Sequence, residues 1–151
     1  MSDAATPLSK QRLKLWIRLL GLTRATERQL REFLRVEHDT TLPRFDVMAA
    51  LWRKRDGLTM SELSRMLLVS GGNTTVVVNG LEKEGLVKRT TSTKDSRIVY
   101  VALTEKGLAD FEDMAAGHEA ELDRLLGAFD EEAITSIVEI LKRAPVSPPL
   151  G

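Results

Sequence analysis

The stretch from Thr59 to Thr104 constrains the fold most strongly, because it predicts a helix, a tight break, a second helix and a β-hairpin in one continuous run. Thr59 and Glu62 have the spacing of a capping box, in which each side chain bonds the other residue's backbone, so a short helix is expected over 59–68. A serine and two glycines break it, and a second helix is expected over 70–84 with that serine as its cap. Two helices joined this closely are typical of a helix-turn-helix.

The β-hairpin is predicted from two segments, 86–89 and 97–103, which are separated by a polar and charged tip. Upstream, residues 41–57 predict another helix, because a proline is tolerated in its first turn and a glycine ends it. Three short helices followed by a hairpin are the element order of a winged helix.

Long amphipathic helices are expected on both sides of this unit. Residues 8–36 contain no proline and carry apolar residues at helical spacing, and a second stripe of about six turns runs from Leu108 to Phe129. A last helix is expected from Asp130. These stripes are longer than a small domain needs for its own core, so we expect both chain ends to pair with a second copy in a two-fold dimer.

The expected fold class is mainly α with a small β-hairpin wing. A chain of 151 residues with 42% hydrophobic residues can bury one core, so a single domain over 1–151 is expected. Within it, about 1–40 and 104–144 would be dimerisation helices. The winged helix-turn-helix region for DNA binding would occupy about 43–103.

The net charge of zero conceals an asymmetry along the chain. Residues 1–43 hold eight Lys or Arg and five Asp or Glu, residues 44–100 hold ten and six, and residues 101–151 hold four and eleven. The predicted helix-turn-helix therefore carries net positive charge, as phosphate binding requires. Ordinary solvated charge is the alternative explanation.

Several classes of site are not expected. The absence of cysteine rules out thiolate metal ligands, thiol-based oxidant sensing and cysteine nucleophiles, and it fits a reducing compartment. The two histidines, His38 and His118, lie eighty residues apart, and no phosphate-binding glycine loop is present, so we expect neither an enzyme nor a metal or cofactor site. No signal segment or membrane span is apparent, so a cytoplasmic protein without a membrane partner is expected.

Three spaced motifs resemble the multiple antibiotic resistance regulator (MarR) family. They are Gly85-Leu-Val, Asp95-Ser-Arg97 and Leu103-Thr-Glu-Lys-Gly107, preceded by Leu63-Ser-Arg-Met-Leu-Leu-Val-Ser-Gly-Gly-Asn-Thr-Thr. The resemblance covers nearly the whole chain. It implies a homodimeric winged helix-turn-helix repressor that binds a palindromic double-stranded DNA operator and releases it when a small ligand binds, often a phenolic or other aromatic acid.

The start of the second helix supplies the predicted contacts with the major groove, because small and hydrogen-bonding residues let a helix N-terminus approach bases and phosphates. The residues of this set are Ser70, Gly71, Gly72, Asn73, Thr74 and Thr75. Asn73 can pair bidentately with adenine, whereas the alternative is that Ser70 and Asn73 only cap the helix. Family members often carry arginine at the position of Val76 and another basic residue at that of Gly80, which weakens the case for strong guanine recognition here.

The wing tip is the second predicted DNA contact. Arg97, with Lys94, suits the minor groove if Asp95 holds the guanidinium in place. Alternatively, Asp95 and Arg97 form an exposed pair that only stabilises the turn. Further phosphate contacts are predicted, any of which could instead be solvated surface: Arg44, Arg65, Lys88 and Arg89.

An effector pocket is expected from the family resemblance, between the first two helices and the long helix after the wing. The candidates are aromatic, apolar or cationic residues of those elements: Arg12, Trp16, His38, Phe45, Met48, Trp52 and Phe111. An aromatic carboxylate needs a flat apolar wall and a cation, which Trp16 and Arg12 could provide. The Ser-Gly-Gly-Asn-Thr-Thr variant is similar to regulators of aromatic-acid breakdown, whose effectors include coenzyme A (CoA) thioesters. The alternative for each candidate is a place in the core.

A different function remains open at this stage. A winged helix can bind another protein, or dimerise without reading DNA. The feature that favours this alternative is the missing arginine in the second helix. DNA binding that weakens steeply with salt would exclude it.

Overall fold

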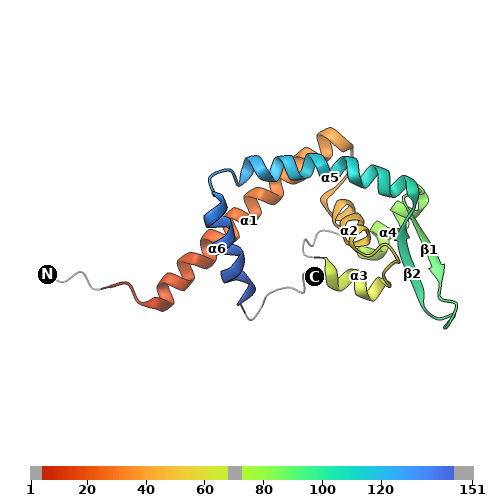
Figure 1. Cartoon of the computed structure of the whole chain (residues 1–151), viewed down its shortest axis with the longest axis horizontal. Coiled ribbons are helices and arrows are strands. Elements are labelled where there is room, and N and C mark those ends of the chain that lie inside the picture. The colour runs from red at the N-terminus through yellow and green to blue at the C-terminus, as the bar shows by residue number, and fades with distance from the viewer. Residues whose placement is uncertain (1–4, 68–72, 145–151) are drawn as a thin grey trace.

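A computed structural model describes residues 5–67 and 73–144, which form a mainly helical chain with a two-stranded antiparallel hairpin (Figure 1). The elements are α1 (Leu8–His38), α2 (Leu42–Arg53), α3 (Met60–Met66), α4 (Thr74–Lys83), β1 (Val87–Thr91), β2 (Val99–Leu103), α5 (Glu105–Leu125) and α6 (Glu131–Lys142). The predicted fold class of helices with a hairpin wing is confirmed. None of the helices in these ranges is both long and apolar enough to cross a membrane.

The core lies where α2, α3, α4 and the hairpin meet. Each of these elements contributes at least one apolar side chain that is fully buried: Val47, Leu51, Leu63, Leu81 and Val101. A short bridge ties the loop before α3 to the wing, because Leu58 and Val101 exchange two backbone hydrogen bonds of 2.9 and 2.7 Å. The hairpin is therefore anchored to the helical core rather than attached only at its ends.

Local capping explains where most helices begin. The capping box of Thr59 and Glu62 is present, and the Thr104 and Asp130 side chains cap α5 and α6. The predicted start of the second helix was wrong, because α4 begins at Thr74 with Asn73 as its N-cap. The side-chain carbonyl of an asparagine can accept the free N–H groups of a helix's first turn, so it caps a helix as effectively as serine would.

The hairpin leads directly into α5. Val87 pairs with Leu103 and Thr91 with Val99, which leaves residues 92–98 as the tip. At the base, Gly107 packs so closely that an added Cβ would lie 1.9 Å from the Leu86 carbonyl oxygen. This glycine lets the first turn of α5 sit directly on the end of the wing.

The flanking helices differ in how they are packed. The C-terminal half of α1 crosses α5 and buries Leu30 and Leu34, whereas its N-terminal half projects away from the winged helix and is largely exposed (Figure 1). Helix α6 has no buried residue in the part of the chain that the structure describes. The second predicted stripe was too long as a single helix, because α5 ends at Leu125 and Phe129 lies in the turn before α6.

Candidate nucleic-acid interface

Helix α4 presents an exposed polar face that starts at its N-cap. The Asn73 side-chain oxygen accepts hydrogen bonds from the backbone N–H groups of Thr75 (2.9 Å) and Val76 (3.4 Å). Thr75 and Val76 are exposed and Thr74 is half-buried. The capping alternative for Asn73 therefore holds, and the amide keeps its N–H groups for an outside partner. The predicted contacts at Ser70, Gly71 and Gly72 lie outside the described residues.

The opposite face of α4 explains this orientation. Val78 and Leu81 are fully buried, and they lie three residues apart, so they turn one side of the helix into the core. Residues on the other side must then face solvent. The fold thus exposes the first turns of α4, which is the end of a recognition helix that can enter a groove.

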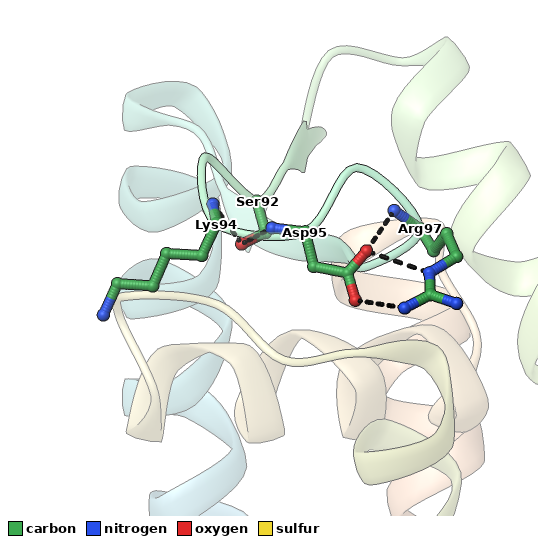
Figure 2. A network of polar contacts seen from close by, with 4 residues as sticks. All are labelled: Ser92, Lys94, Asp95 and Arg97. Carbon is green, nitrogen blue, oxygen red and sulfur yellow. Dashed lines mark hydrogen bonds and ion pairs between the residues drawn. The ribbon is translucent and has the colours of Figure 1, made fainter.

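The wing tip holds Arg97 in a fixed arrangement (Figure 2). Its Nε and Nη2 donate to the two Asp95 carboxylate oxygens at 3.1 and 3.2 Å, and its backbone N–H donates to Oδ1 at 3.0 Å. These hydrogen bonds lower the pKa of Asp95 below its ordinary value. The Ser92 hydroxyl in turn accepts the backbone N–H groups of Lys94 and Asp95 at 3.2 and 3.4 Å. The tip is therefore a closed turn that aims a guanidinium.

The Arg97 side chain remains accessible despite this pairing. It is 88% exposed, whereas the Asp95 side chain is 33% exposed. Lys94 extends away from the pair in Figure 2. The predicted arrangement of an acidic residue that positions a cation is thus present in the structure, and a role in the minor groove stays a prediction.

The other predicted phosphate contacts fall into two groups. Lys88 and Arg65 project from exposed positions. Arg89 is engaged instead, because its Nη1 donates to Glu82 at 3.1 Å and its Nη2 donates to Asn79 at 2.6 Å, so it ties β1 to α4. These two bonds hold the wing against α4.

Arg44 forms a similar tie on the other side of α4. Its guanidinium pairs with Glu84 at the C-cap of α4, and its Nε donates to the Thr40 hydroxyl at 3.2 Å. Its side chain is about three-quarters buried, at 25% exposure. In this conformation Arg44 connects α2 with the end of α4 rather than pointing to an outside phosphate.

The seven predicted effector residues do not form one pocket. Phe45, Met48 and Phe111 are buried in the core. Trp52 sits at its edge with its ring centroid 5.9 Å from that of Phe111. Arg12 and Trp16 lie on the projecting half of α1, where Trp16 is 56% exposed. The core alternative therefore applies to three of the candidates.

His38 lies in a different place, at an open cleft of about 520 Å³ between the end of α1, the start of α2, the end of α4 and α5. Its Nδ1 is 3.9 Å from Asp113 Oδ2. Met48 and Met114 form part of the apolar floor, and the remaining polar lining includes Arg44, Glu84 and Asp110. The Arg44–Glu84 pair is therefore part of the wall of this cleft.

Two titratable residues were missed as site candidates. His118 stacks on Phe45 with ring centroids 4.3 Å apart, and burial lowers its pKa. Asp46 carries a buried Oδ2 with no hydrogen-bond partner among residues 5–67 and 73–144, and burial raises its pKa to about 7. The sequence showed His118 only as a member of an apolar stripe. Asp46 gave no signal, because its burial depends on how α2 packs.

Comparisons with known proteins agree with this arrangement. The MarR family model matches residues 38–98. The HTH-type transcriptional regulator MhqR of Bacillus subtilis is 29% identical, covering 90% of this chain and 92% of its own. A MarR family transcriptional regulator from Silicibacter pomeroyi is 31% identical, with a TM-score of 0.76 over 91% of this chain and 95% of its own. A mutant Escherichia coli MarR complexed with operator DNA is 24% identical, with a TM-score of 0.75 over 91% of this chain and 98% of its own, and so supports the fold.

Proposed function

Because the chain belongs to the MarR family of DNA-binding transcriptional regulators, we propose that it acts in the cytoplasm as a homodimeric repressor, which binds a palindromic operator and is released by a small ligand. The observation that carries the proposal is the pairing of an exposed α4 face with an accessible Arg97 on the adjoining wing. Arg89 bonds the two elements together, so they can meet one duplex as a unit. One reaches the major groove and the other the neighbouring minor groove.

The dimer is supported by apolar side chains that a lone chain leaves in water. They occur on the projecting half of α1 and on α6, and they include Leu15, Trp16, Ile17, Ile134, Ile137 and Ile140. Soluble monomers rarely keep so large an apolar surface exposed. Pairing of these helices in a second copy would cover it and would set the distance between two recognition helices, which must match successive turns of the duplex, roughly 34 Å apart.

Binding to DNA is tested by fluorescence anisotropy on the duplex upstream of the chain's own gene and its neighbours. We expect specific binding that survives unrelated competitor DNA and weakens as salt rises, because phosphate contacts release counterions. If specific and unrelated duplexes bind equally weakly at low salt, the repressor proposal fails. A winged helix that binds another protein would then be the better explanation.

We further propose that the effector is an aromatic acid or its CoA thioester. The cleft beside His38 supports a coupling mechanism, because Arg44 reaches it while paired with Glu84 at the end of α4. For the free acid, a ligand carboxylate that took the place of Glu84 would free the end of α4 from α2. DNA affinity would then fall without any contact between ligand and DNA.

The charge of the ligand can be tested directly. The cleft also carries Asp110 and Asp113, which repel an anion and attract a cation. A matched set of one aromatic ring bearing a carboxylate, an amide or an amine therefore separates the possibilities in the anisotropy assay. Release by the carboxylate alone supports the proposal, provided that Arg44→Gln, which lacks the tie to Glu84, binds DNA more weakly without ligand and no longer responds to the carboxylate. Release by the amine alone overturns the acid as the effector class while leaving the DNA-binding proposal intact.

A further inference from the structure

We propose that Val76 recognises the C5-methyl group of a thymine in the major groove, which makes it a specificity-determining residue for the operator half-site. This inference rests on the proposed function, since it requires that α4 enters the groove of a specific operator. It adds the chemistry of one base contact.

Val76 is unusual within α4 because it is apolar and 65% exposed. The other branched apolar residues of this helix face inward, as Val78 and Leu81 are fully buried and Val77 packs against the core. A valine has no hydrogen-bonding group, so it cannot bond a phosphate or a polar base edge. Among the four bases, thymine presents an apolar group in the major groove, its C5-methyl. This is the group that a valine side chain can contact favourably.

The neighbouring amides present donors rather than acceptors to an outside partner. The side-chain oxygen of Asn73 already accepts two backbone N–H groups, and that of Asn79 accepts Nη2 of Arg89 at 2.6 Å. Because these partners are N–H donors, the amide atom that faces them must be the oxygen and not the nitrogen. Both residues therefore turn their Nδ2 groups to other partners. Bidentate pairing with adenine needs a free acceptor as well, which the doubly bonded Asn73 oxygen lacks, whereas the Asn79 oxygen is held on one side by the Arg89 guanidinium.

A thymine satisfies both features of this surface. Its major-groove edge carries the O4 acceptor beside the C5-methyl group. An amide donor and a valine methyl next to each other on one helix are complementary to that edge. Guanine also offers acceptors to the amides, but it has no methyl group for Val76.

The helix geometry places these groups on one side. Asn73, Val76 and Asn79 are spaced by three residues, so they follow one another along the exposed face over roughly 9 Å, at about 1.5 Å rise per residue. That length corresponds to two or three base-pair steps. Gly80, in the next turn, adds no side chain to this face, so Val76 lies between the two asparagines as its apolar member.

The test removes the methyl group from the DNA rather than from the protein. The full chain is used to select an operator from random duplexes, and each thymine of the two half-sites is then replaced by deoxyuridine, which differs only in the C5-methyl group. At one symmetric position we expect affinity to fall about fourfold per half-site, the factor that corresponds to one buried CH₂ group, and about fifteenfold when both half-sites are changed. At other thymines the change should be negligible.

Protein variants assign the effect to Val76. Val76→Ala should bind the thymine operator about as weakly as the parent binds the uridine operator, and it should no longer distinguish the two. Val36→Ala is the matched control, because Val36 is also an exposed helical valine, 57% exposed at the end of α1. It should keep the full preference for thymine. Thermal unfolding of each variant shows whether a loss of binding reflects a loss of folding.

Failure of specific DNA binding and failure of the Val76 contact give different results in these experiments. If the selection recovers no specific operator, the proposed function itself fails. If a specific operator binds but uridine is tolerated at every position, or if Val76→Ala keeps the preference, the DNA-binding proposal stands and the role of Val76 is overturned. Replacing the sensitive T·A pair by C·G and then by 5-methylcytosine·G gives an independent check, because the methyl group alone should recover part of the lost affinity.

Discussion

The wing offers the sharpest quantitative prediction. Substituting Arg97→Ala removes a guanidinium that is 88% exposed at the hairpin tip and leaves the Asp95 carboxylate without its cationic partner. A protein that neutralises one phosphate contributes about −0.9 to the slope of log affinity against log salt. A dimer carries two wings, so the slope of the variant should be shallower by roughly 1.8. Affinity should also fall at every salt concentration, because the unpaired carboxylate then faces the phosphates.

Two companion variants separate charge from geometry. Arg97→Lys keeps the charge, so the salt slope should stay near that of the parent. Its point-charge ammonium cannot donate two parallel hydrogen bonds to Asp95, so affinity should still drop. The double change Asp95→Asn with Arg97→Ala removes the bare carboxylate and should recover part of the affinity lost by Arg97→Ala alone, without restoring the slope.

The assay is anisotropy of a labelled operator duplex at four or more salt concentrations, with unrelated duplex as competitor. A slope for Arg97→Ala that equals the parent's within error would refute the reasoning, since it would mean that Arg97 meets no phosphate in the complex. Under that result the Asp95–Arg97 pair would be a turn-stabilising contact only.

Three further predictions concern folding and assembly. Gly107→Ala should lower the free energy of unfolding in urea by about 3 kcal/mol, since its Cβ has no room, whereas Gly21→Ala, with open space, should raise it by about 0.5–1 kcal/mol. Burial raises the Asp46 pKa to about 7, so the parent loses free energy of unfolding as pH rises from about 4 through 7 and this carboxyl ionises. Asp46→Asn cannot ionise, so its stability relative to the parent should increase over the same pH range. Ile140→Glu should yield a monomer by light scattering with little change in helicity, while the exposed control Thr135→Glu should remain a dimer.

Features that depend on close neighbours in the chain were predictable. The capping box at Thr59 joins residues three apart, and the Asp95–Arg97 pair joins residues two apart, so a short pattern contains both partners. Such contacts need only the local backbone conformation that the same residues favour. The hairpin, the helix order and the wing cation followed from patterns of this kind.

The start of α4 shows the limit of local reasoning. Ser70 and Asn73 are both good capping residues, and the sequence offered no way to choose between them. The structure selects Asn73, whose oxygen accepts the N–H groups of the first turn. This choice also changes the function of the residue, because an oxygen engaged in capping is no longer an acceptor for a base.

The predicted effector residues do not lie together in one pocket, for a related reason. Phe45 and Trp16 look alike in a helical pattern, yet one is buried where α2 meets α5 and the other is exposed on a part of α1 that the chain itself does not cover. Which apolar stripe becomes core depends on which helices meet, and that is settled by packing over the whole chain.

The sequence by itself therefore determined the winged helix, its segment-by-segment charge and the Asp95–Arg97 pair in the wing. These features depend on periodicity, on composition and on partners a few residues apart. Tertiary structure alone decided the ties Arg44–Glu84 and Arg89–Asn79, which join residues forty and ten positions apart. It also decided the separation of core from exposed aromatic residues and the outward direction of Val76. Long-range contacts form only where buried faces pack together, so the groups left outside, which we propose bind DNA or a second copy, are those that the core excludes.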